Sequence, residues 1–237
     1  MSVAAYELNK HREQKMTNTV FKIEELDSAS QELDMTLGIN PDVFRDSMQS
    51  GLSLYKSVNK FHPVTAGGSR AWEEIVATFR TLVVDQNDGW RSIQQNGMPV
   101  LINSELNATI VITSGDEHTG LKSSHEPKTR NAKGQVTESF VGQNYDLFDD
   151  TTTTIFQPTD SHQTWVLLYT LDKTKSEVRY ELSLPTNTSI SGNKGKIKIT
   201  EWQTRIIFPA ISFNEIHVTI PSHEFTDDSD FFDIIKK

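Results

Sequence analysis

Two segments in the first ninety residues carry hydrophobic side chains at helical spacing. The first follows Asn40-Pro41, a pair typical of a helix start, and it predicts a helix over residues 41–59. Its apolar face is formed by Phe44, Met48, Leu52 and Tyr55. The second follows Gly67-Gly68-Ser69, and its broader apolar stripe predicts a helix over residues 70–84. Gly67-Gly68-Ser69-Arg70 could bind an anion at this helix start, but it lacks the Lys-Ser/Thr ending of a phosphate loop and is set aside.

From Gly97 onward the hydrophobic pattern is that of strands. Residues 164–171 are apolar on both faces, which predicts a central buried strand. Residues 177–184 alternate, with Glu177, Arg179 and Glu181 expected to point outward and to face Lys196 and Lys198 across a hairpin. Further strands are expected at residues 98–103, 107–113, 196–200, 205–208 and 216–220.

Helices followed by strands predict an α+β fold. N-terminal helices would pack on a mostly antiparallel, strand-rich sheet or sandwich in the C-terminal two-thirds. We expect one domain over residues 19–237, preceded by a polar and mobile lead over residues 1–18. The helical part would extend to about residue 92 and the strand-rich part from about 97 to 222, with the seam near 89–97 and an acidic aromatic tail over 223–237.

Composition narrows the class of protein. The 237 residues include no cysteine, which excludes disulfides, thiolate metal sites and a cysteine nucleophile. A formal net charge of −9 argues against a general nucleic-acid binder, because such affinity depends on basic residues that meet phosphates. The sequence shows neither a signal-peptide pattern nor a long apolar run, so we expect a cytoplasmic protein with no membrane contact.

The polar connection over residues 114–134 is the main candidate site. Connections of this length are uncommon inside a compact domain and are usually functional or disordered. From Thr119 to Gly134 it carries four basic residues against one acid, Glu126. The candidate binding residues in this connection are Lys122, Lys128, Arg130 and Lys133. A mobile, solvated loop is the alternative without a function.

An alternative hypothesis is that the protein is a metal-dependent hydrolase of the nuclease type, with its active site in the same connection. Its catalytic candidates would be Asp116, Glu117, His118, His125, Glu126 and Lys128. Glu126-Pro127-Lys128 has the carboxylate-x-lysine spacing of many metal-dependent nucleases, although Pro127 argues against the strand that such a site requires. No serine-hydrolase, phosphate-loop or zinc-protease signature is present, and the sequence predicts no bound metal and no cofactor.

The function that the sequence favours is non-enzymatic. We expect a binding or accessory protein that docks a macromolecular partner, most simply a protein, through the 114–134 connection, the acidic tail or both. In the tail, Phe231 and Phe232 are the candidate contacts. Nucleic acid would be bound only locally, through residues 119–134. A third hypothesis is an acidic inhibitor of a basic target, and the oligomeric state is not predicted.

Overall fold

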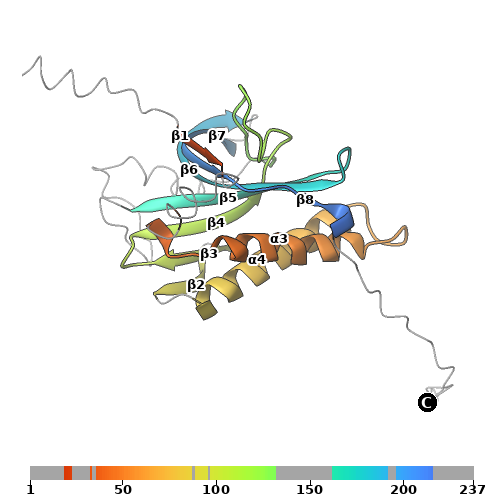
Figure 1. Ribbon diagram of the computed structural model, residues 1–237, viewed down its shortest axis with the longest axis horizontal. Helices are drawn as coiled ribbons and strands as arrows, with labels where there is room; N and C mark the ends of the chain where they lie inside the picture. The colour runs from red at the N-terminus through yellow and green to blue at the C-terminus, as the bar shows by residue number, and fades with distance from the viewer. Residues whose placement is uncertain are drawn as a thin grey trace, which may run out of the picture.

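The described part of the chain forms a sheet of eight strands with two long helices on one of its faces (Figure 1). The computed structural model describes residues 19–22, 33, 36–86, 89–95, 97–131, 162–191 and 196–215. The helices are α3 (Pro41–Lys56) and α4 (Ala66–Gln86), and a 3₁₀ turn, η1, spans Phe213–Glu215. The strands are β1 (Thr19–Lys22), β2 (Trp90–Gln95), β3 (Met98–Asn103), β4 (Ala108–Ser114), β5 (Gln163–Asp172), β6 (Glu177–Ser191), β7 (Lys196–Ile207) and β8 (Ile211–Ser212).

The sheet is mostly antiparallel, and this confirms the predicted α+β class. Its strand order is β1-β7-β6-β5-β4-β3-β2, with β8 paired to β6. The exceptions are two parallel pairs, β4 with β5 and β1 with β7. Adjacent parallel strands cannot be joined by a tight turn and need a long crossover. The chain from the end of β4 to the start of β5 is that crossover, and it contains the candidate connection.

Local sequence signals explain where the helices begin. The side chain of Asn40 caps α3 by accepting a hydrogen bond from the Asp42 backbone N–H at 2.8 Å. Helix α3 ends at Lys56, three residues before the predicted end. Helix α4 begins at Ala66, four residues before the predicted start, because a turn in which the Ala66 N–H bonds to the Pro63 carbonyl oxygen leads directly into it.

The two helices cross at a glycine. A Cβ added to Gly51 would overlap the Ile75 side chain and would lie 2.8 Å from the Ala71 carbonyl oxygen. Gly51 therefore allows the backbone of α3 to approach α4 closely, although it weakens the helix by itself. The sheet side of this layer is aromatic, since the Phe44 ring lies 5.0 Å from the Phe79 ring and 4.8 Å from the Phe208 ring.

Several strands differ from the prediction. The seam near 89–97 contains strand β2, which sequence analysis treated as a connection. Strand β6 continues past the predicted end at residue 184, and β7 joins the two strands predicted at 196–200 and 205–208 into one. The pairing of β6 with β7 has irregular register between Leu184 and Thr188. Bulges of this kind let a long ribbon twist, which hides the simple alternation that sequence analysis relies on. The strand predicted at 216–220, the lead over 1–18 and the tail over 223–237 lie outside the described residues.

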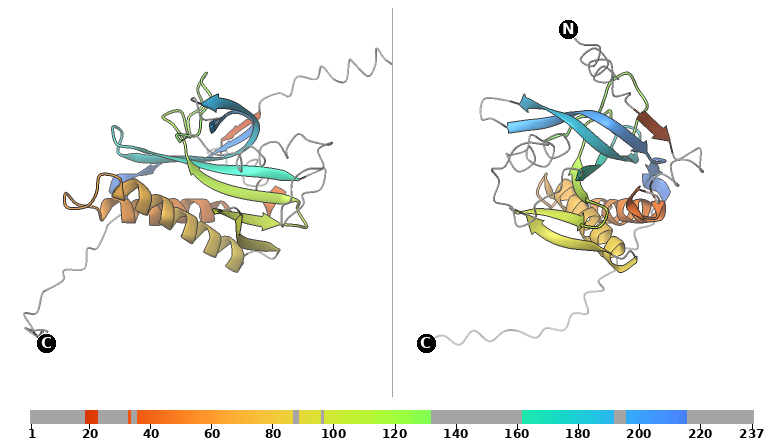
Figure 2. Two further views of the ribbon diagram at one scale, coloured as in Figure 1. Left: turned by 180° about the vertical axis from the view of Figure 1, so that it is seen from behind. Right: turned by 90° about the vertical axis from the view of Figure 1, so that its left-hand side faces the viewer.

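Both faces of the sheet are covered. The two helices lie along one face of the sheet (Figure 2). On the helix side, the core includes Trp165, Leu167, Tyr180 and Leu182, while Val166 and Leu168 belong to a second buried cluster. Strand β5 is therefore buried on both sides, as its sequence predicted. Among the described helices, none is long and apolar enough to cross a membrane.

Replacing Gly51 with alanine tests the close helix crossing. We expect the free energy of unfolding to fall by about 1–3 kcal/mol, because the added methyl group overpacks the α3–α4 contact. The matched control is Gly68→Ala, since a Cβ there meets nothing within 4 Å, and this change should leave stability equal or slightly higher. Urea denaturation of both variants measures the difference. Equal stability of the two variants would contradict the proposed role of Gly51.

His162, at the entry to β5, should make stability depend on pH. Its side chain is buried, its Nε2 lies 2.8 Å from the Thr109 hydroxyl, and burial lowers its pKa to about 4. The unfolded chain binds the proton more readily, so the contribution of this residue to stability is present above about pH 6.5 and is lost as the pH falls toward about 4. Denaturation at pH 7 and pH 4.5 measures this loss. Between the two pH values, the free energy of unfolding should fall less for His162→Gln than for the unmodified protein or for the exposed-site control His125→Gln.

Candidate functional site

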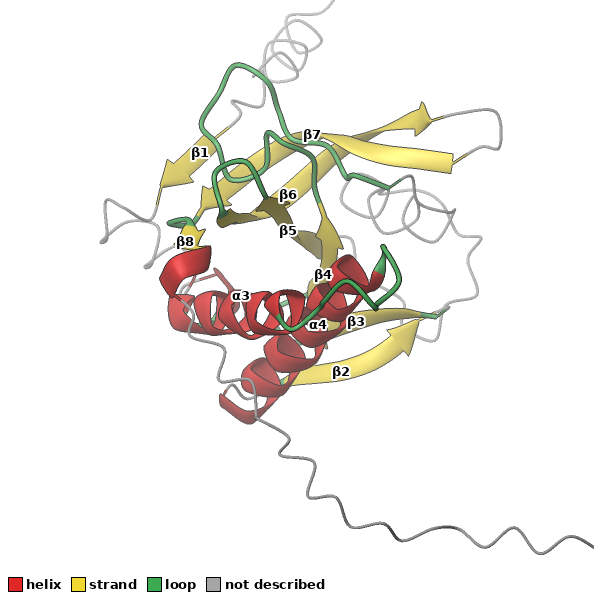
Figure 3. Cartoon of the chain, turned by 90° about the vertical axis from the view of Figure 1, so that its right-hand side faces the viewer, coloured by secondary structure: helices red, strands yellow, loops and turns green. Residues whose placement is uncertain are grey.

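The segment from Gly115 to Asn131 lies over the face of the sheet opposite the helices (Figures 1 and 3). It turns back along β4, since the Asp116 N–H bonds to the Lys128 carbonyl oxygen and the Arg130 N–H bonds to the Ser114 carbonyl oxygen, both at 2.9 Å. Gly115 and Thr129 form an isolated antiparallel bridge. We call residues 115–131 the covering segment, and it begins the crossover between β4 and β5.

A buried ion pair beneath the covering segment joins β6 to β7. Glu181 is 0% exposed and Arg205 is 2% exposed, and their closest charged atoms, Oε2 and Nη2, are 2.6 Å apart. The Arg205 Nε donates a second bond to Glu181 at 2.9 Å, and the Ser183 hydroxyl donates a third at 2.8 Å. Burying two charges is costly unless their hydrogen-bonding positions are filled, and these strands fill most of them.

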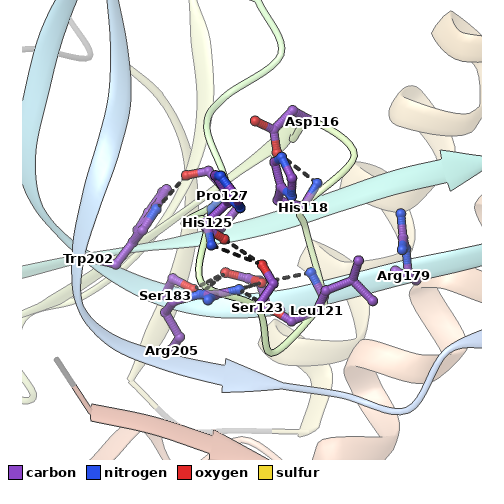
Figure 4. A network of polar contacts seen from close by, with 12 residues as sticks. Asp116, His118, Leu121, Ser123, His125, Pro127, Arg179, Ser183, Trp202 and Arg205 are labelled. Carbon is purple, nitrogen blue, oxygen red and sulfur yellow. Dashed lines mark hydrogen bonds and ion pairs between the residues drawn. The ribbon is translucent and has the colours of Figure 1, made fainter.

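The covering segment completes the coordination of this ion pair (Figure 4). The Gly120 N–H donates to Glu181 Oε2 at 2.8 Å, and the Leu121 carbonyl oxygen accepts from Arg205 Nη2 at 3.1 Å. Gly120 has a φ of +71°, and a Cβ there would lie 2.8 Å from the Arg179 Cβ. Glycine is therefore needed at this position for both the backbone conformation and the close approach to β6.

Two further contacts hold the ends of the covering segment. Near its start, the Arg179 guanidinium donates to the Glu117 carbonyl oxygen at 2.8 Å and lies 3.2 Å from the Asp172 carboxylate. The pKa of Asp172 is lowered, first by its hydrogen bond from the Lys175 backbone and also by Arg179. Near its end, the Trp202 indole N–H donates to the Pro127 carbonyl oxygen at 2.8 Å.

Two of the three expected outward charges on β6, Arg179 and Glu181, are therefore buried. Arg179 and Glu181 point away from the helices, as the alternation predicted, but the covering segment lies on them. Glu181 pairs with Arg205, and the predicted partners are displaced along the ribbon, with Lys196 opposite Ser191 and Lys198 opposite Ser189. The prediction failed because it treated this face of the sheet as solvated.

The nuclease-type candidates do not form a metal site. Within the described residues, no group of three acidic or histidine side chains could hold a metal ion. The His118 and His125 rings stack with their centroids 5.2 Å apart, while the Asp116 carboxylate is used to accept the His118 backbone N–H at 3.1 Å. The Glu117 side chain is 82% exposed. These contacts stabilise the turn of the covering segment and do not bring its carboxylates together.

The Glu126-Pro127-Lys128 run also lacks the geometry of a nuclease strand. It has no regular secondary structure, as Pro127 predicted, and the Lys128 side chain is exposed. Glu126 is half-buried, and its pKa is raised, mainly by the loss of hydration, with Arg205 acting in the opposite direction.

The basic candidates occupy the outer side of the covering segment. Lys122, Lys128 and Arg130 are exposed, while Thr129 between the last two is fully buried and bonds to both backbone groups of Ile199. The segment is thus held from beneath and is not the free loop that one interpretation of its polarity suggested. Lys133, Phe231 and Phe232 lie outside the described residues.

The anchoring residues were missed as site residues by sequence analysis. The signal for them was indirect: residues 164–171 are apolar on both faces, which requires a cover over both faces of the sheet, and charged side chains on neighbouring strands must then be paired. Comparison with known proteins adds no relative, because no family model, no curated protein and no solved structure matches this chain.

Replacing Glu181 with glutamine tests the role of the buried ion pair. The substitution keeps the shape of the side chain but leaves the Arg205 charge buried without its counter-charge, so we expect a loss of about 3–5 kcal/mol in the free energy of unfolding. Limited proteolysis should then cleave within residues 115–131 faster than in the unmodified protein. The control is Glu177→Gln, because that carboxylate is partly exposed and 3.7 Å from Arg179, and its loss should cost less than about 1 kcal/mol.

Proposed function

We propose that this chain is a non-enzymatic binding protein that docks an acidic surface of a partner protein. The docking surface is formed by five of the exposed residues of the covering segment: Lys122, Ser123, Ser124, His125 and Lys128. The observation that supports the proposal is the contrast between this polar, exposed side and the buried anchors beneath it.

A segment held in this way is suited to recognition. Ordering a free loop on binding costs conformational free energy, and a loop that is already fixed avoids most of that cost. Here the backbone is fixed at Gly120, Leu121, Pro127 and Thr129, so the exposed side chains between them project from a held backbone.

Charge favours an acidic partner. The five residues of the docking surface include two lysines and no acid, so this surface is locally cationic, although the whole covering segment carries three acidic and three basic residues on a chain of formal net charge −9. Local charge of this kind directs the orientation in which a partner of opposite charge approaches. The lack of cysteine is compatible with a reducing compartment, and the proposal places the protein in the cytoplasm.

Charge reversal at Lys122 and Lys128 tests the proposal. Deleting the covering segment would also uncover the Glu181–Arg205 pair, so point substitutions are the better choice. We expect Lys122→Glu with Lys128→Glu to change the unfolding free energy by less than about 0.5 kcal/mol, since both residues are exposed. The same variant should lose the partner protein that the unmodified chain retains in quantitative affinity enrichment from cell extract.

The matched control is Lys173→Glu with Lys175→Glu, which makes the same charge change at exposed sites in the β5–β6 turn. This control should retain the partner. Binding should also weaken with rising salt, because exposed charges are screened. Equal retention of the same proteins by both double variants would refute the proposal, and retention of nucleic acid in place of protein would refute the choice of partner.

A further inference from the structure

A cavity of about 410 Å³ lies where the carboxyl ends of β4 and β5 meet the start of α4. Its wall is built from three parts of the chain that are distant in sequence. The first turns of α4 contribute Gly68, Ser69 and Trp72, the strands contribute Thr113 and Tyr169, and the end of the covering segment contributes Arg130. Cavities of this size hold small organic molecules.

The charges around the cavity favour an anion. Of the described residues that line it, Arg130 alone carries a charge. A hydrogen bond from Arg130 Nη2 to the Thr170 hydroxyl at 2.9 Å orients its guanidinium. The opposite wall is the beginning of α4, whose first turn contains no acidic residue. The positive end of the helix dipole is therefore not compensated by a side chain.

A buried hydroxyl in the wall points to a ligand independently of the helix. Thr113 is 6% exposed, and its Oγ1 has no hydrogen-bond partner in the described part of the chain. An unsatisfied buried hydroxyl costs about 1–3 kcal/mol, so native proteins seldom keep one without a use. A polar group bound in the cavity would give this hydroxyl a partner after a rotation about the Thr113 side-chain bond that turns Oγ1 toward the cavity.

One part of the remaining wall is aromatic, whereas most of the other lining residues are polar: Thr65, Ser69, Ser114, Asn131 and Thr170. Trp72 is 36% exposed, and its indole N–H bonds to the Ile112 carbonyl oxygen at 3.3 Å, which fixes the ring at the cavity. Tyr169 is buried in the core between the sheet and the helices, and burial raises the pKa of its hydroxyl, which stays protonated and able to donate. An aromatic ring would fit this side of the cavity better than a fully hydrated ion.

We infer that the cavity binds a small organic anion, an oxyanion carried on an aromatic body. The oxyanion lies between Arg130 and the start of α4, and the aromatic body lies against Trp72. This site is independent of the proposed docking surface, because neither Lys122 nor Lys128 lines the cavity.

Titration with simple aromatic probes tests the inference. The probes are phenyl phosphate and phenylacetate as the two oxyanions, benzyl alcohol as the neutral analogue, and inorganic phosphate as the anion without a ring. Isothermal titration gives the affinities. A change in tryptophan fluorescence on binding reports the site, because Trp72 lines the cavity and the other three tryptophans, Trp90, Trp165 and Trp202, do not.

Gly68→Asp is the most selective variant. A Cβ at Gly68 meets nothing within 4 Å, and an acid in the first turn of a helix is favourable, so the variant should fold at least as stably as the unmodified protein. The carboxylate repels a bound anion. We expect binding of an oxyanion probe to weaken about tenfold or more, while Gly68→Asn, of equal size and without the charge, retains it.

Arg130→Gln is a second variant, which removes the charge from the other wall and should also weaken binding about tenfold. Its control is Arg91→Gln, because Arg91 is exposed on β2 and bonds only to the nearby Ser104 hydroxyl among the described residues. Whichever of phenyl phosphate and phenylacetate binds more tightly identifies the oxyanion. The inference is overturned if neither probe binds, if benzyl alcohol binds equally well, or if Gly68→Asp and Arg130→Gln leave the affinity unchanged.

Discussion

The buried pair of Glu181 and Arg205 is the interaction on which the face of the sheet opposite the helices depends. Its two charges lie on β6 and β7 with the register Ser183 opposite Arg205, so a slip of one residue would turn Glu181 toward the apolar helix side. The covering segment contributes a donor from Gly120 and an acceptor from Leu121. Strand register and the position of the covering segment are therefore determined together.

The parallel pairing of β4 with β5 explains why a covering segment is present. The chain leaves β4 at one end of the sheet and begins β5 at the opposite end, so the connection between them must return the length of a strand. A chain that crosses a sheet face buries backbone groups, and these need partners. Arg179, Trp202 and Arg205 supply them from the strands, each through a side-chain bond to a carbonyl oxygen of the covering segment.

The fold was largely predictable because its elements are determined locally. Neighbouring residues alone determine the helix pattern that follows Asn40-Pro41 and the strand at 164–171 that is apolar on both faces. These elements predicted the α+β class, which the structure confirms. Strand β2 was missed because Trp90 is its one buried residue, and its other side chains lack a clear apolar face.

The site was less predictable because it depends on strand pairing. The length and polarity of the 114–134 connection mark it as unusual in the sequence, but the residues that it covers depend on how the strands pair. Arg205 meets Glu181 because β6 pairs with β7. Bulges near Leu184 interrupt this pairing, so the register cannot be deduced from the alternation of either strand. Paired charges on adjacent strands resemble ordinary surface charges until a third segment is known to cover them.

One short extended run links the two surfaces that we assign to binding. Residues Lys128, Thr129 and Arg130 alternate between exposed and buried, so the anchor at Thr129 holds a docking lysine on one side and the cavity arginine on the other. A substitution that loosened Thr129 would disturb both surfaces and could not separate them. Substitutions at the exposed lysines or at Gly68 leave the Thr129 anchor in place, because these side-chain positions make none of the contacts that hold the covering segment on the sheet. For this reason the two binding surfaces can be examined one at a time in the intact chain.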